Sequence, residues 1–280
     1  MIVYLAGTIS RPYLYETIFS RSGGVSIENK MKLYLAGEHT VKNGTTANWS
    51  GLKILESYVY AKDNKQFNQL INGNVDLLMD SGAFTYMNGN GGKVNWDTYI
   101  EQYAEFINKH DIKLFFELDI DSIVGIKEVE RLRNKLETLT NKKCIPCWHK
   151  NRGLEYWKQM CRDYDYVAVG TTNEGLKSDN TTRQKLMAIM PGLIKIAKDN
   201  KAKIHGLGFT NLDGLEKYKF DSVDSTAWLY GNRSGIIYKF NGRSIIKIKK
   251  PSGTRLNAKE VAINNFNEWV KFQKYAETNL

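Results

Sequence analysis

The chain has 280 residues, of which 42% are hydrophobic and 25% are charged. This ordinary globular composition excludes a disordered protein, a coiled coil and a collagen-like fibre, and no apolar run approaches the roughly 18 residues of a membrane-spanning helix. Forty Lys and Arg against thirty Asp and Glu give a formal net charge of +10. That balance favours a polyanionic partner, nucleic acid above all, although a solvated lysine-rich surface would give the same number.

The N-terminal stretch has no basic segment before its apolar run and no small-residue cleavage site, so it predicts no signal peptide. The three cysteines, Cys144, Cys147 and Cys161, are too few and too odd in number for a disulfide framework. They are typical of a reducing compartment, and we expect a cytoplasmic protein. Cys144-Ile-Pro-Cys147 looks like half of a zinc site, but it lacks a second ligand pair at comparable spacing. We therefore expect neither a metal nor a cofactor.

Short apolar runs alternate with amphipathic segments along the chain. The runs that we expect to form strands are Leu33–Ala36, Asp76–Met79, Lys113–Leu118, Cys144–Cys147, Tyr166–Val169, Lys203–Leu207 and Asp221–Val223, with an eighth over Ile54–Tyr60 that also reads as helix. The expected helices are Trp96–His110, Lys127–Thr140, Gly153–Cys161 and Thr182–Asn200. This rhythm predicts parallel strands buried on both faces. Eight strands would close a (β/α)8 TIM-type barrel, and an open doubly wound sheet is the alternative.

The two ends of the chain follow a different pattern. MIVYLAG at 1–7 resembles LYLAG at 33–37, but one echo does not establish a repeat. Near the C-terminus, two β-rich runs flank Asn241-Gly242, a strong hairpin signal, and an amphipathic helix is expected near Asn257–Ala276. We expect one domain over 1–280, to which the basic hairpin and helix of 231–280 are appended.

Several expected strands end in carboxylates, namely Asp80, then Glu117, Asp119 and Asp121, then Asp221 and Asp224. A carboxylate at a buried strand end is paired, hydrated or functional, although Asp is also a common helix N-cap. A group of carboxylates suits three chemistries: divalent-metal binding, acid and base catalysis on a glycosidic bond, or a nucleophile beside a base-reading group.

Four short motifs follow one another in chain order: Asp80-Ser81-Gly82-Ala83-Phe84, Val169-Gly170, Ile204–Gly208 and Phe220–Val223. Together they resemble the motifs of tRNA-guanine transglycosylases. Asp80-Ser81-Gly82-Ala83-Phe84 resembles the family's Asp-Ser-Gly-Gly-aromatic motif, and Val169-Gly170 resembles a degenerate form of its glycine-rich loop. Ile204–Gly208 is similar to the late strand that ends in Gly-Val-Gly, and Phe220–Val223 falls where the family has Phe-Asp-Cys-Val. The resemblance covers 76–226. It is nearest to the short, phage-type members related to the DNA-guanine transglycosylases, which insert 7-deazaguanines into DNA.

The resemblance implies a (β/α)8 barrel that exchanges a purine base through a covalent sugar–enzyme intermediate. It assigns Asp221 as the nucleophile on C1′ and Asp80 as the general acid/base. Asp119, or failing that Asp121, would accept hydrogen bonds from the guanine edge. The remaining implied substrate contacts are Phe84 and His205 on the two faces of the base, Gly170 lining the site, and the adjoining Ser81, Gly206 and Asp224.

The departures from the family concern the region after the nucleophile strand. The tRNA-acting members carry a zinc site of three Cys and one His there, whereas no cysteine follows Cys161 in this chain. The family's Pro-Thr-Arg is replaced by Asp224-Ser225-Thr226, which leaves Asp224 as an alternative nucleophile. We therefore expect a guanine transglycosylase that acts on DNA, with tRNA as the second substrate class. A DNA glycosylase and a non-catalytic nucleic-acid-binding protein remain the alternatives.

The expected partners are DNA or tRNA and a free guanine or 7-deazaguanine base, in a host cytoplasm if the protein is phage-encoded. No membrane partner is expected, and a homodimer or a partner subunit is left open. The nucleic acid would be bound by basic residues of the hairpin region through its phosphates. The candidate contacts are Arg233, Lys239, Arg243, Lys247, Lys249 and Lys250.

Overall fold

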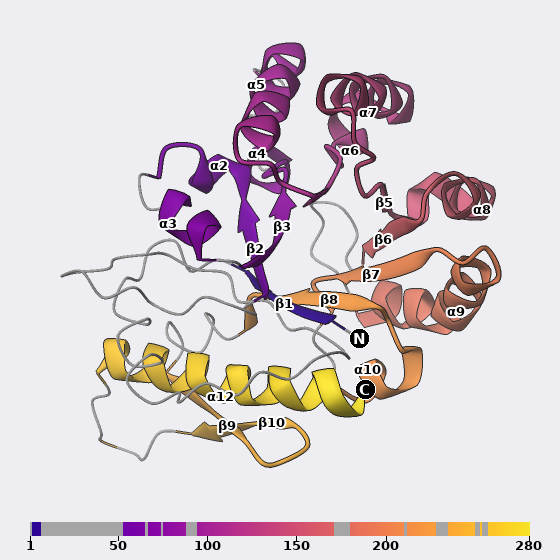
Figure 1. Ribbon diagram of the computed structural model, residues 1–280. Coiled ribbons are helices and arrows are strands. Elements are labelled where there is room, and N and C mark those ends of the chain that lie inside the picture. Colours follow the sequence, from indigo (N-terminus) through magenta and orange to yellow (C-terminus); the bar gives the residue numbers. More distant parts are fainter. Residues whose placement is uncertain are drawn as a thin grey trace. The chain divides into compact units, whose positions relative to one another are not determined.

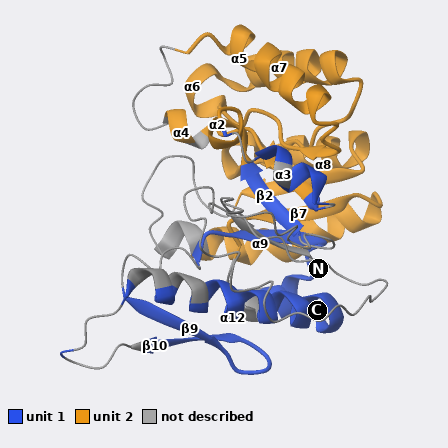
Figure 2. Cartoon of the chain, turned by 60° about the vertical axis from the view of Figure 1, so that its left-hand side comes forward, with its two compact units in different colours: residues 1–56, 64–76, 210–280 blue, residues 57–63, 77–209 orange. Residues whose placement is uncertain are grey.

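The computed structural model describes residues 2–6, 53–64, 67–73, 75–87, 94–170, 180–209, 212–227, 235–249, 253 and 257–280 (Figure 1). The chain divides into two compact units, shown in Figure 2: a first unit of 1–56, 64–76 and 210–280, and a second unit of 57–63 and 77–209. The expectation of a single domain over 1–280 stays a prediction. No helix in these residues is long and apolar enough to cross a membrane.

The second unit is built around parallel strands that follow one another in chain order. β3 (Asp76–Asp80) pairs with β4 (Leu114–Phe115), and a parallel bridge between Phe116 and Ile145 leads on to β5 (Cys147–Trp148). β5 pairs with β6 (Tyr166–Gly170), which pairs with β7 (Lys203–Leu207). Because these strands are parallel, their carboxyl ends lie at one edge of the sheet.

This sheet is strongly curved. The rings of Phe116, beside β4, and His205, on β7, lie 5.2 Å apart between centroids. Neighbouring strands are about 4.8 Å apart, so three steps span about 14 Å in a flat sheet. Side chains stand roughly perpendicular to a sheet, and the two rings can therefore meet only on the concave face of a curled one.

Helices alternate with these strands and lie on their outer side in Figure 1. The long ones are α5 (Trp96–Lys109), α7 (Ile126–Thr140), α8 (Gly153–Asp163) and α9 (Asn180–Asp199). The short ones are α2 (Tyr58–Ala61), α4 (Phe84–Met87), α6 (Asp121–Val124) and the 3-10 turn η2 (Lys150–Arg152). The sequence predicted the four long helices to within two residues at each end.

Helix α5 shows why the prediction worked. Its buried residues recur every three or four positions, as the helical period requires. The Asn95 side chain accepts a hydrogen bond from the Thr98 amide at 3.1 Å, which caps the first turn. Lys109 lies in the last turn, where a cation interacts favourably with the helix dipole.

The first unit contains a second set of parallel strands. β1 (Ile2–Ala6) lies between β2 (Lys53–Ser57) and β8 (Ser222–Ser225), so the first strand of the chain pairs with a late one. The sequence treated MIVYLAG only as an echo of 33–37; it is a strand, and the expected strand Leu33–Ala36 lies outside the described residues. The run Ile54–Tyr60 is divided between β2 and α2. The short helices of this unit are α3 (Phe67–Asn72) and α10 (Leu212–Tyr218).

The predicted hairpin and C-terminal helix are confirmed. β9 (Ile236–Phe240) and β10 (Ile245–Lys249) pair antiparallel, and α12 (Ala258–Asn279) packs on β9. The Tyr238 ring meets Trp269 at 5.8 Å, and the Asn265 side chain accepts the Tyr238 amide hydrogen at 2.7 Å. Side chains of α12 thus bind the backbone along one edge of the hairpin, which ties this basic element into the first unit.

Candidate functional site at the carboxyl ends of the strands

The turn after β3 holds Asp80 in a defined position. Gly82 has a φ of +77°, and a Cβ there would lie 2.3 Å from the Val59 side chain, so only glycine fits. The Gly82 amide donates to Asp80 Oδ2 at 3.2 Å, and the Tyr99 hydroxyl donates to the Ser81 carbonyl at 2.6 Å. Asp80 is half-buried at the end of its strand. Asp80 is thus partly exposed at the strand end, whereas Ser81 is fully buried.

Three carboxylates follow β4 at every second position, and the structure separates their roles. Glu117 is completely buried, the Asp121 side chain is 4% exposed, and the Asp119 side chain is 20% exposed. Asp121 accepts hydrogen bonds from Arg152 Nη2 at 2.6 Å and from the Asn151 side chain at 2.8 Å. Of these three carboxylates, Asp119 is the one best placed to meet a ligand.

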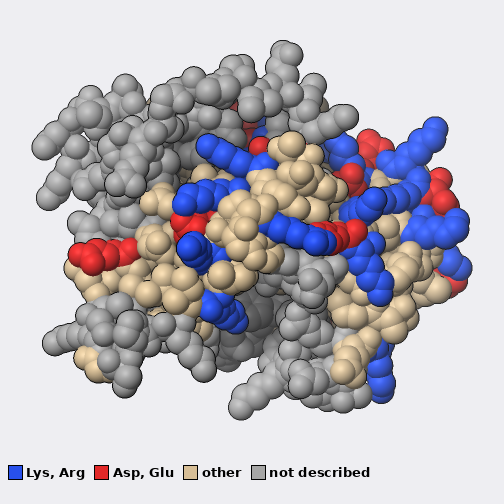
Figure 3. Space-filling model, turned by 90° about the horizontal axis from the view of Figure 1, so that it is seen from below, with Lys and Arg blue, Asp and Glu red and all other residues tan. Residues whose placement is uncertain are grey.

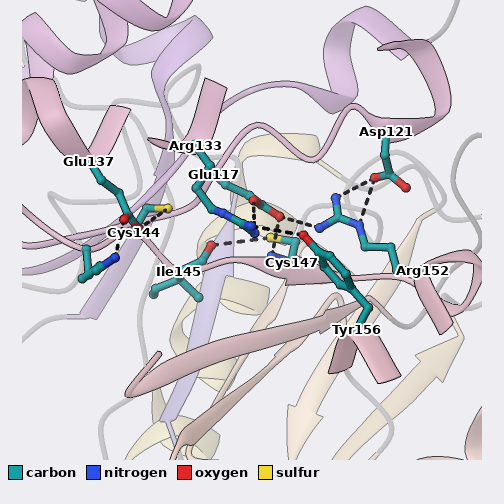
Figure 4. Close-up of polar contacts among 10 residues, drawn as sticks. Glu117, Asp121, Arg133, Glu137, Cys144, Ile145, Cys147, Arg152 and Tyr156 are labelled. Carbon is teal, nitrogen blue, oxygen red and sulfur yellow. Dashed lines mark hydrogen bonds and ion pairs between the residues drawn. The ribbon is translucent and has the colours of Figure 1, made fainter. Parts of the chain in front are cut away.

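Glu117 anchors a buried ion-pair network (Figure 4). Its two carboxylate oxygens accept hydrogen bonds from Arg133 Nη1 at 3.1 Å and from Arg152 Nη1 at 2.7 Å. The Cys147 amide donates to the same carboxylate at 2.8 Å. Burial alone would lower the pKa of the Arg152 guanidinium, but Glu117 and Asp121 outweigh burial and raise it. Arg152 thus stays charged and holds the residues two positions before and two positions after Asp119.

Asp119 itself meets a histidine from the next strand. His149 directly follows β5, and its Nε2 lies 3.3 Å from Asp119 Oδ2. The imidazole lies against Gly170 at the end of β6, where an added Cβ would come within 2.4 Å of His149 Nδ1. Asp119, His149 and Gly170 therefore form a contact chain across the carboxyl ends of three consecutive strands. We call these three residues the carboxyl-edge triad.

The other predicted base contacts occupy different positions. His205 lies within β7, completely buried, with its ring on Phe116. Gly206 lies beside it in register with Val169. Phe84 begins α4, and only its backbone is described. His205 thus belongs to the concave face of the sheet, deeper than the carboxyl-edge triad, and its stacking on a base stays a prediction.

The structure corrects the placement of Asp221. The sequence predicted that Asp221 lies within a strand and near its end, whereas β8 begins one residue later, with Ser222 in register with Ile2. The start of a strand is set by its non-local pairing with β1, which the local pattern does not reveal. Asp224 is the third of the four residues of β8, nearer its carboxyl end, and both side chains are half-buried.

Of the six predicted basic contacts, the side chains of Lys239, Arg243 and Lys247 are described. Arg233 and Lys250 lie outside the described residues, and only the backbone of Lys249 is described. The Arg243 guanidinium binds Glu216 at 2.8 Å. In the hairpin register Lys239 pairs with Ile246 and Lys247 with Tyr238, so these exposed lysines leave opposite faces of the ribbon. Seen from below, Lys and Arg side chains stand among Asp and Glu (Figure 3).

The three cysteines are buried free thiols. Burial raises the pKa of the Cys144 and Cys147 thiols well above the ordinary value, and the nearby Glu117 charge adds to both shifts. Both thiols therefore stay protonated at neutral pH, the form that neither binds metals nor attacks electrophiles. Within the described ranges, no group of three or more His, Cys, Asp or Glu side chains is arranged to hold a metal ion.

The site predicted from the sequence did not include the two residues that organise this edge, His149 and Arg152. His149 follows the strand-like run that ends in Cys147-Trp148, so its place at a strand end was a usable signal. Arg152 carried no such signal, because it reaches Glu117 across 35 positions of the chain. Contacts at that separation depend on the parallel pairing of the strands and leave no local pattern.

Comparisons with known proteins show only distant likeness. No protein-family model and no curated protein matches the sequence. Among solved structures, the carboxyl transferase domain of Rhizobium etli pyruvate carboxylase with 3-bromopyruvate aligns over 82% of this chain and 42% of its own, at 17% identity and a TM-score of 0.43. The same domain with 3-hydroxypyruvate aligns over 75% and 37%, at 17% identity and a TM-score of 0.38. The chain spans about two fifths of these chains.

Proposed function

We propose that this protein is a nucleic-acid guanine transglycosylase built on a closed (β/α)8 barrel, with DNA ahead of tRNA as its substrate. It would exchange guanine for a free 7-deazaguanine base. The observation that carries the proposal is the carboxyl edge of the second unit. There Asp80 ends one strand, and Asp119, bound by His149, follows the next.

The strand pairings support a barrel. β1 pairs with both β2 and β8, which joins the first parallel strand to a late one as a circular order requires. β3 to β7 follow one another in order, and the contact between Phe116 and His205 requires strong curvature. Two further pairings, β2 with β3 and β7 with β8, would complete the barrel. The carboxyl ends of all eight strands would then surround one site.

The chemistry follows from carboxylates at such an edge. A carboxylate of the β8 segment would attack C1′ of the nucleoside, forming an ester bond to the sugar as the bond to guanine breaks. Asp80 would donate the proton that the departing base needs. It would then accept a proton from the incoming 7-deazaguanine, whose ring nitrogen displaces the carboxylate and restores a glycosidic bond. Asp119 would read the N–H groups of the base edge.

Two carboxylates compete for the role of nucleophile. The resemblance to the transglycosylases assigns Asp221, which precedes β8. The general rule that barrel enzymes react at the carboxyl ends of their strands favours Asp224. The two residues differ in position but not in chemistry, so each is the matched control for the other.

The deciding experiment is base exchange with labelled guanine on DNA and on tRNA. The wild-type chain is compared with Asp221→Asn and Asp224→Asn after each variant is shown to fold. Loss of the nucleophile should lower the exchange rate by on the order of a thousandfold or more, and should abolish the covalent adduct. The other variant should keep both the exchange and the adduct.

The other outcomes assign different functions. Release of free guanine without uptake of label would identify a DNA glycosylase, with water in place of the incoming base. Binding without turnover on either substrate would identify a non-catalytic nucleic-acid-binding protein. Exchange on tRNA but not on DNA would support the proposed transglycosylase reaction, with tRNA instead of DNA as its substrate.

A further inference from the structure

We infer that His149 is a positioning residue of the proposed site, which holds Asp119 in the orientation that reads guanine, and that Gly170 serves by leaving room for its imidazole. This inference rests on the proposed function, because it concerns how the base is recognised. It assigns roles to a residue that the resemblance does not include and to a glycine that the resemblance places against the substrate.

The first argument is the way the backbone around Asp119 is held. Arg152 binds Glu117 through Nη1 and Asp121 through Nη2, at 2.7 and 2.6 Å. Asp119 lies midway between these two residues. The guanidinium, whose side chain is 1% exposed, therefore fixes the chain on both sides of Asp119. What remains adjustable is the rotation of the Asp119 side chain.

The second argument is that His149 is held as firmly as Asp119. The Arg152 amide donates to the His149 carbonyl at 2.9 Å. Two residues earlier, the Cys147 amide donates to Glu117 at 2.8 Å. The same Glu117–Arg152 pair therefore anchors both strand ends, so the distance of 3.3 Å from His149 Nε2 to Asp119 Oδ2 is set by the scaffold.

The third argument is the space at Gly170. A Cβ on this residue would lie 2.4 Å from His149 Nδ1 and 2.6 Å from Cε1, too close for either atom to remain. The φ of Gly170 is not in the left-handed region, so its backbone does not require glycine. The imidazole is therefore what keeps a side chain out of this position.

The chemical consequence concerns selectivity. Each carboxylate oxygen has two lone-pair sites. Asp119 Oδ2 can therefore accept both from a base and from His149 Nε2, in the tautomer that carries its proton on that nitrogen. An oriented carboxylate then accepts from N1–H and from the 2-amino group of guanine with its two oxygens. Hypoxanthine lacks the 2-amino group and makes only one of these bonds. Loss of the Asp119 orientation should therefore lower the affinity for guanine more than the affinity for hypoxanthine.

The test measures binding of free guanine and free hypoxanthine to the full chain by calorimetry. His149→Ala should weaken guanine binding by about tenfold to a hundredfold, the range for a hydrogen bond to a charged group, with a smaller loss for hypoxanthine. His149→Gln, whose amide nitrogen can reach the place of Nε2, should recover most of the affinity. His110→Gln, at the end of α5, is the matched control and should change neither.

Gly170→Ala tests the second half of the inference. In the wild-type background it should lower guanine affinity about as much as His149→Ala, because the imidazole must move. In the His149→Ala background it should cost nothing further, since the methyl group takes the space that the ring left. A loss that persists in that background would show that Gly170 faces the base itself, and would overturn its role here.

The outcomes separate this inference from the function on which it rests. A wild-type chain that neither binds guanine nor exchanges it overturns the proposed function, and this inference with it. A wild-type chain that binds guanine, with His149→Ala unchanged or with equal losses for both bases, overturns the role of His149 alone.

Discussion

Among single residues, Glu117 links the end of β4 to three other elements. Its carboxylate joins the end of β4 to the backbone of β5, to Arg133 on α7 and to Arg152 on η2. A carboxylate that is completely buried is stable only when its charge and lone pairs are matched. Two arginines and one amide match them here. Removal of the Glu117 charge should therefore destabilise the fold.

Glu117→Gln keeps the shape and removes the charge. Arg133 and Arg152 would then share a buried site without their common counter-ion, and we expect the free energy of unfolding to fall by about 3–5 kcal/mol. Urea denaturation at neutral pH measures the change. Glu101→Gln is the control, because Glu101 is exposed and binds Lys135 on the surface; its effect should stay within about 0.5 kcal/mol. Equal, small effects from both would contradict the account.

The sequence predicted single residues unevenly. Asp80 and Gly170 are the last residues of β3 and β6, as their positions after apolar runs indicated, whereas Asp119 follows the end of β4 at Phe115 by four positions. The resemblance placed Asp119 ahead of Asp121, but the contact that buries the Asp121 side chain left no local pattern, because Arg152 is 31 positions away from Asp121. Asp221 was placed wrongly for the same reason, since the pairing with β1 sets where β8 begins.

At the scale of the element, α5 and α7 are joined by a cluster of surface charges. Asp97 accepts from Arg131 Nη1 and Nη2, at 3.0 and 2.7 Å, and from Lys135 at 2.7 Å. These hydrogen bonds lower the pKa of Asp97 from its ordinary 3.8 to about 2. Because the folded-state pKa is below the unfolded one, the stabilisation is present above pH 3.8 and is lost as the pH falls toward 2.

The cluster predicts a pH-dependent mutant effect. Asp97→Asn should lower the urea midpoint at pH 6, and the difference from the wild-type chain should vanish as the pH is lowered from about 4 to about 2. Because the pair is exposed, the difference at pH 6 should be modest and should shrink in 1 M salt. Glu105→Gln, an exposed glutamate of the same helix, is the control. A difference that persists unchanged at pH 2 would rule out ionisation of Asp97 as its cause.

Elements with a strong period were predicted well and short strands were not. The long helices have apolar faces that repeat over three or more turns, so their own residues define them. β4 and β5 have only two residues each. Ile54–Tyr60 is mostly apolar, apart from Glu56 and Ser57, and it changes from strand to helix at Tyr58. Runs of this length fit either structure, and their neighbours in space decide between them.

At the scale of the whole molecule, the net charge of +10 predicts a polyanion but does not locate it. The described lysines of the hairpin point to opposite faces, and the one described arginine is held by Glu216. A nucleic acid lying along one face of the ribbon would therefore meet Lys247 or Lys239, but not both. Replacing Lys239 and Lys247 separately should therefore show which face of the hairpin binds the nucleic acid.

The final prediction tests which face of the hairpin binds phosphate. If Lys247 and Lys249 each contact one phosphate, replacing both with Ala should weaken binding to DNA of any sequence and flatten the plot of log affinity against log salt. The slope should change by about 0.9 for each contact on a duplex, or about 0.7 on a single strand.

Lys239→Ala, on the other face, is the matched control and should keep the wild-type slope. Binding of free guanine should be unchanged in all variants, since it would use the strand ends. If the double variant keeps the wild-type slope on duplex, single strand and tRNA, these lysines do not bind phosphate. Their role would then be to keep a solvated strand edge from pairing with another chain. The nucleic acid would then bind elsewhere on the chain.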